Sequence, residues 1–178
     1  MPLPIAHGLI GASLVIAGRE EFSWRESWWP LLVGAVLAVS PDFDLFFAWI
    51  LGYHARLHGG VSHSILFAVP LGLLGALLAR EFTRRGVLVY FLVALSHGAL
   101  DFVTKKEFGG AALLWPFSSE KLRLGIFSYY EFTPAPGAQP LSEILEQALD
   151  VSYYEILTFV PLFMAVLIWN YRRQRRAL

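Results

Sequence analysis

The 178-residue chain contains no cysteine, which excludes both disulfides and thiolate metal sites. Charge is also scarce, since Asp, Glu, Lys and Arg make up 16% of the residues, against about 25% in ordinary soluble domains. The formal net charge is zero, so no overall basic field points to nucleic acid as a partner. The N-terminus lacks the basic stretch that opens a cleavable signal peptide, which predicts a retained first helix.

Apolar residues are abundant instead. They form 56% of the chain, aromatic residues form 15%, and the mean hydropathy is +0.55. This composition is typical of a membrane protein, and the length predicts one membrane-embedded domain over residues 1–178. About 20 mostly apolar residues are needed to cross a bilayer as a helix. Five segments approach that length, and they predict an all-α polytopic bundle: residues 3–18, 28–50, 61–80, 86–103 and 152–170. Pro41 predicts that the second helix ends or kinks near Ser40.

The basic residues in the connections predict an orientation. We define side A as the side that holds the N-terminus and side B as the opposite side. With five spans, side B holds nine Lys and Arg residues, including the C-terminal "RRQRR", and side A holds five. The expected location is the cell (inner) membrane. The positive-inside rule then places side B and the C-terminus in the cytoplasm, and side A on the extracytoplasmic face of that membrane.

One long connection, residues 104–150, lies on side A. Its first part, "FGGAALLWPFS", is apolar and aromatic, as an interfacial segment would be. Its last part, "LSEILEQALD", has an apolar helical stripe. We interpret that part as a packing helix that leads into the last span, or alternatively as a lid over a site at the membrane surface.

Ionisable residues gather at one level of this topology. His97 and Asp101, four residues apart in an apolar segment, share one helix face. All five histidines and three of the four aspartates fall near the side A ends of the predicted spans. Imidazole and carboxylate groups suit zinc, manganese or iron, and bridging carboxylates can hold two metals in phosphoester hydrolases. The candidate ligands, enough for two or more divalent ions, are His7, Asp42, Asp44, His58, His63, His97 and Asp101.

Each candidate also has a purely structural interpretation. His7 could form a hydrogen bond within the bundle, and Asp42 or Asp44 could cap a helix. The glycines after His58 let the backbone turn both His58 and His63 inward. His54 is interpreted as an exposed loop residue. Arg56 could pair with an acid or bind a substrate phosphate.

Four stretches resemble the YdjM-like family of membrane-bound, metal-dependent hydrolases: "AHGLIG", "SPDFDL", "HGGVSHS" and "HGALDFVTKKEFGGAALLWPFS". The similarity covers residues 5–117. The family is similar to zinc-dependent phospholipases C and single-strand-specific zinc nucleases, so the resemblance implies a helical fold and metal ligation by the same seven residues, with zinc as the first expectation. Two positions depart from the family pattern, because Gly59 stands where an Arg is usual and Ser62 where a Thr is usual.

The expected function is therefore a membrane-bound, metal-dependent hydrolase, a phosphoesterase that acts on a lipid or lipid-linked phosphate with a metal-activated water. Asp44, together with Asp42, is the expected catalytic carboxylate, and Arg56 is the expected substrate-binding residue. The expected partners are membrane lipids and the phosphoester substrate, without nucleic acid. The alternatives are a metal-ion or proton transporter that uses the same cluster, and a membrane module in which the metal only stabilises the fold.

Overall fold

The computed structural model describes residues 3–44, 58–104, 110–126 and 140–177. Within them the chain is all-helical, as predicted. The helices are α1 (Pro4–Gly18), α2 (Trp24–Val39), α4 (Ile65–Leu78), α5 (Arg84–Val103) and α6 (Leu141–Ala177). Two short 3₁₀ turns, η1 (Ser40–Asp42) and η3 (Val61–His63), lie beside the helix ends. Ala111 and Leu122 form an isolated antiparallel bridge.

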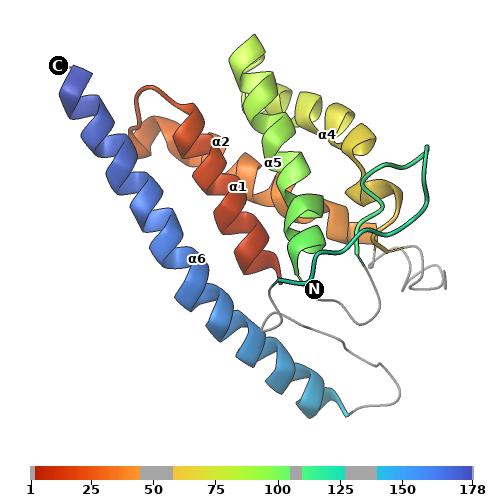
Figure 1. Ribbon diagram of the computed structural model, residues 1–178. Coiled ribbons are helices and arrows are strands. Elements are labelled where there is room, and N and C mark those ends of the chain that lie inside the picture. The colour runs from red at the N-terminus through yellow and green to blue at the C-terminus, as the bar shows by residue number, and fades with distance from the viewer. Residues whose placement is uncertain (1–2, 45–57, 105–109, 127–139, 178) are drawn as a thin grey trace.

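The helices form a bundle in which α1 contacts α2, α5 and α6, while α4 packs against α5 (Figure 1). Small residues let α1 and α2 approach closely. A Cβ atom at Gly11 would come within 2.5 Å of the Gly34 carbonyl oxygen, so the crossing requires glycine. The buried core between α1, α2, α4 and α5 contains Val15, Ile16, Leu37, Tyr90 and Val93.

The break near Pro41 is confirmed, because α2 ends at Val39 and η1 follows directly. The first and fourth spans match α1 and α5 to within two residues, but the third needs correction. The third helix begins at Ile65 instead of residue 61, since Val61–His63 form a separate turn. By length and composition, only α5 and α6 are able to cross a membrane among the described helices, while α1 and α4 are shorter apolar helices.

The C-terminal helix differs most from prediction. The segment "LSEILEQALD" is not a separate packing helix, because it is continuous with the last span in the 37-residue α6. Its leucines stay exposed, with Leu141 and Leu149 at 70%. In Figure 1 this end of α6 extends past the other helices. Helical propensity continues through Asp150, so no turn signal ends the helix there.

Candidate metal centre

The structure brings the seven predicted ligands together at one end of the bundle. His7 comes from α1, His97 and Asp101 from α5, and His63 from η3. Asp42 ends η1, Asp44 follows it, and His58 precedes η3. His54 and Arg56 lie outside the described residues.

The centre of the cluster is the pair His63 and His97. Their Nε2 atoms are 3.0 Å apart, and Nε2 of His97 is 3.3 Å from Oδ1 of Asp42. Nδ1 of His97 donates a hydrogen bond of 2.7 Å to the carbonyl oxygen of Ala38. Because Nδ1 carries the proton in that bond, neutral His97 presents the Nε2 lone pair to the cluster.

His58 and His63 are oriented in the same way by polar partners. Nδ1 of His58 lies 2.7 Å from Oδ1 of Asp44, and Nδ1 of His63 lies 2.9 Å from Oγ of Ser62. The Ser62 hydroxyl in turn donates a 2.6 Å hydrogen bond to Oδ2 of Asp44. Ser62 therefore accepts from His63, so both histidines direct Nε2 inward. A carboxylate behind a histidine is a common arrangement at metal sites.

His7 and Asp101 form the deepest part of the cluster. Their side chains are 1% and 0% exposed, and His7 Nε2 is 3.8 Å from Asp101 Oδ1. The His7 ring stacks on the His97 ring at a centroid distance of 3.9 Å. Asp101 Oδ2 also lies 3.2 Å from His63 Nε2. Two helices and one turn therefore meet at these four side chains.

The donor set fits divalent metal ions. Three overlapping groups have ligand atoms within 4.8 Å of one another: His7, Asp42 and His97; Asp42, His58 and His63; His63, His97 and Asp101. Buried atoms on three of these residues have no hydrogen-bond partner, namely both ring nitrogens of His7, both carboxylate oxygens of Asp42 and Nε2 of His58. Because buried polar atoms are normally satisfied, unpaired acceptors that converge favour a cation between them.

Asp44 belongs to none of the three groups. It contacts His58 and Ser62 instead, so its predicted role as a ligand stays a prediction. Burial is the largest single influence on Asp44 and raises its pKa, but the hydrogen bonds from His58 and Ser62 and the charges of His58 and His63 together outweigh burial, so the pKa lies below its usual value. Burial lowers the pKa of His63 more than its hydrogen bond to Asp101 raises it, which favours the neutral, ligating form.

Two glycines make the close packing of the site possible. Gly59 has φ of 76°, a left-handed conformation that side chains disfavour, and it turns the chain between His58 and His63. Gly98 follows His97 in α5, and a Cβ atom there would lie 2.4 Å from the His63 carbonyl oxygen. The role predicted for the glycines after His58 is consistent with this geometry.

The second half of the chain supplies a cover on side A. Ala112 N–H donates to the Gly59 carbonyl at 2.8 Å, and Ile65 N–H donates to the Leu113 carbonyl at 3.0 Å. Lys121 Nζ donates to the His58 carbonyl oxygen at 2.6 Å. Residues 110–122 are thereby attached to both ends of the His58–His63 segment.

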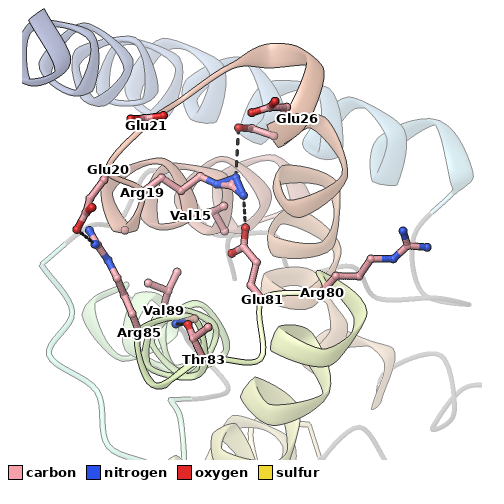
Figure 2. Close-up of a pocket in the computed structure, with 13 residues that line it drawn as sticks. Val15, Arg19, Glu20, Glu21, Glu26, Arg80, Glu81, Thr83, Arg85 and Val89 are labelled. Atoms are coloured by element: carbon pink, nitrogen blue, oxygen red, sulfur yellow. Dashed lines mark hydrogen bonds and ion pairs between the residues drawn. The ribbon is translucent and has the colours of Figure 1, made fainter. Parts of the chain in front are cut away.

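A separate cavity of about 400 Å³ lies at the opposite end of the bundle (Figure 2). Arg19 contacts both Ser27 and Glu81 there, and Arg85 pairs with Glu20. The sequence did not predict a polar set on side B. The cavity lining contains no histidine or aspartate, so it does not repeat the chemistry of the cluster.

Sequence reasoning missed the polar residues of α6. Glu155 is 0% exposed and Asn170 is 1% exposed, although α6 contains a stretch apolar enough to cross a membrane. The available signal was a carboxylate and an amide inside an apolar segment, which indicates internal polar partners.

Comparison with known proteins agrees with this picture. The model of a family described as "YdjM inner membrane protein" matches residues 1–177. The chain is also 32% identical to the inner membrane protein YbcI of Escherichia coli (strain K12) over 157 residues, which covers 80% of this chain and 84% of the relative. No solved structure matches the chain significantly. The chain, with its helical bundle and His/Asp cluster, is therefore a member of the YdjM inner membrane protein family.

Proposed function

We propose that the protein is a metal-dependent hydrolase of the inner membrane that cleaves a phosphoester in a lipid or lipid-linked phosphate. The observation that carries this proposal is the convergence of three overlapping ligand groups on shared residues, Asp42, His63 and His97. Shared ligands suit two or more ions held close together, as in hydrolases that act on phosphoesters. Zinc is the first candidate, with manganese or iron as alternatives. Such ions, when bound, supply the Lewis acidity that activates water and stabilises negative charge on a phosphoryl group.

Among the described ligands, the partly exposed side chains lie together at one edge of the cluster, which favours a reactive site over a closed structural one. His7, His63, His97 and Asp101 are buried, whereas Asp42, Asp44 and His58 are partly exposed, at 10%, 21% and 12%. A substrate therefore approaches from the Asp44–His58 edge. Asp44 is suited to act as the general base there, because it is ionised and already accepts hydrogen bonds.

Membrane location supports a lipid substrate. Residues of the side A cover, Leu114 and Phe117, are 50% and 93% exposed beside the site. Exposed apolar side chains at this level suit contact with an acyl chain. In this function Asp42 is a second catalytic carboxylate, and Arg56 is the phosphate-binding residue. Membrane lipids and the phosphoester are its partners.

Transport is the weaker alternative. A carrier needs access to its site from both sides. Among the described residues, Tyr90, Val93 and Ile16 are fully buried in the apolar core between the cluster and side B. We also propose the orientation predicted from the basic residues, with side A on the extracytoplasmic face and the C-terminus in the cytoplasm.

The test combines metal content with phosphoesterase assays. Protein purified in detergent is dialysed against metal-free buffer and analysed by mass spectrometry, then assayed on phospholipid substrates with the ion found. We expect two or more ions per chain and activity that is lost in the double variant His97→Ala, Asp101→Ala. Ser27→Ala, which changes a buried polar residue at the opposite end, is the matched control. Activity that survives in the double variant would refute the proposal.

A further inference from the structure

Glu155 forms an unusual contact between the two ends of the chain. Its carboxylate, fully buried in α6, accepts hydrogen bonds from the backbone N–H groups of Leu3 and Ala6. The Ala6 bond is 3.0 Å long. These amides belong to the start of α1, where Leu3 is the N-cap and no side chain of α1 itself provides a cap. Free amides and the positive end of the helix dipole both favour a carboxylate at this point.

Asn170 makes the complementary contact at the other end of α1. Its Nδ2 donates to the carbonyl oxygens of Ile16 and Arg19, at 2.9 and 3.0 Å. About 22 Å separates Glu155 from Asn170 along α6, at 1.5 Å per residue. The same rise places about 20 Å between Ala6 in α1 and Arg19, the residue that follows α1 as its C-cap. The two helices therefore run in the same direction, and α6 satisfies polar backbone groups at both ends of α1.

The alignment of α1 against α6 that these contacts fix matters most for His7. The other histidines of the cluster each have Nδ1 against a second group, Asp44 for His58, Ser62 for His63 and Ala38 for His97. Neither ring nitrogen of His7 has a hydrogen-bond partner. The position of its ring thus depends on where the backbone of α1 lies, and Ala6, the residue before it, is bound to Glu155.

We propose that Glu155 is a positioning residue of the metal centre, which fixes the depth of His7 in the cluster by binding the first amides of α1. Asn170 stabilises the same pair of helices but acts at the end remote from His7. This inference rests on the metal site of the proposed function, and it is independent of the reaction catalysed.

The test compares Glu155→Gln with Asn170→Ala in detergent-purified protein. Zn²⁺ affinity is measured by competition with a chromogenic chelator, and hydrogen exchange is measured on peptides from α1. Gln keeps the volume of Glu but retains only one acceptor oxygen. We expect Glu155→Gln to weaken Zn²⁺ binding roughly 10-fold or more and to speed exchange at the start of α1. Asn170→Ala should speed exchange at the end of α1 and leave Zn²⁺ affinity unchanged.

A double-variant comparison isolates the route through His7. In a His7→Ala background, Glu155→Gln should cause no further loss of Zn²⁺ affinity, because the ligand that it positions is gone. If Glu155→Gln prevents folding, Glu155→Asp, which keeps the charge on a shorter side chain, takes its place and should bind Zn²⁺ more weakly than both wild type and Asn170→Ala. Equal losses in Glu155→Gln and Asn170→Ala, or faster exchange with unchanged affinity in Glu155→Gln, would overturn the inference. A wild-type protein that binds none of Zn²⁺, Mn²⁺ and Fe²⁺ would instead overturn the proposed metal centre, and this inference with it.

Discussion

Nε2 of His63 and Nε2 of His97 face each other at 3.0 Å, while Nδ1 of each ring is engaged behind it. Two lone pairs directed at one another repel unless a cation lies near both. We expect His97→Ala to reduce Zn²⁺ affinity by more than roughly 100-fold, beyond the usual cost of losing an outer partner. Competition titration measures the loss.

The control for this prediction is Ser96→Ala on the same helix. Its hydroxyl bonds only to the Val93 carbonyl, at 2.7 Å among the contacts described. Zn²⁺ affinity should stay within a factor of two or three of wild type. A comparable loss in both variants would mean that disturbance of α5, not removal of a ligand, explains the effect.

Asp44 should separate metal binding from catalysis. In Asp44→Asn the amide still accepts from His58, but the charge that stabilises the site is gone. We expect Zn²⁺ affinity to fall roughly 10-fold. With the metal restored at high concentration, hydrolysis should stay at least roughly 100-fold below wild type, as for loss of a general base.

Ser62→Ala is the matched comparison for Asp44→Asn. It removes the hydroxyl between Asp44 and His63 and keeps both of those side chains. Activity should recover fully when Zn²⁺ is in excess. Full recovery in Asp44→Asn as well would show that Asp44 acts only through His58.

Gly98 offers a test of packing at the site. A Cβ atom at this position would lie 2.4 Å from the carbonyl oxygen of His63, a backbone atom that cannot rotate away. We expect Gly98→Ala to lower the free energy of unfolding by about 1–3 kcal/mol and to weaken Zn²⁺ binding. In Gly8→Ala the nearest atom would be 3.8 Å away, so that variant should be neutral or slightly more stable. Denaturant titration of both proteins checks the difference.

Removal of metal should lower stability. Without a cation, buried acceptors on His7, Asp42 and His58 lack partners, which costs free energy in the folded state. Treatment with a chelator should lower the unfolding temperature, and Zn²⁺ should restore it. At a free concentration 100 times Kd, the expected gain is about 2.7 kcal/mol. An unfolding temperature that is the same in chelator and in excess Zn²⁺ would contradict this.

Much of the site was visible in the sequence because it follows from spacing. Apolar segments of near-membrane length predict the helices, and the i, i+4 spacing of His97 and Asp101 places both on one face. Successive helices run in alternating directions through the bundle. The helix ends beside His7, Asp42 and His63 therefore lie at the same level. Local propensity and hydropathy decide these features without knowledge of the packing.

Tertiary structure decided the contacts that residue spacing does not predict. Asp44 lies behind His58 and outside the three ligand groups, and Ser62 joins it to His63, because the turn after Gly59 brings those groups together. Glu155 and Asn170 bind backbone groups about 150 residues away in the chain. The sequence determined which helices form and which side chains can reach a metal. Only packing determined which nitrogen of each ring faces inward and which distant amide holds α1 in place, since hydrogen bonds to the backbone depend on where helices meet and not on residue order.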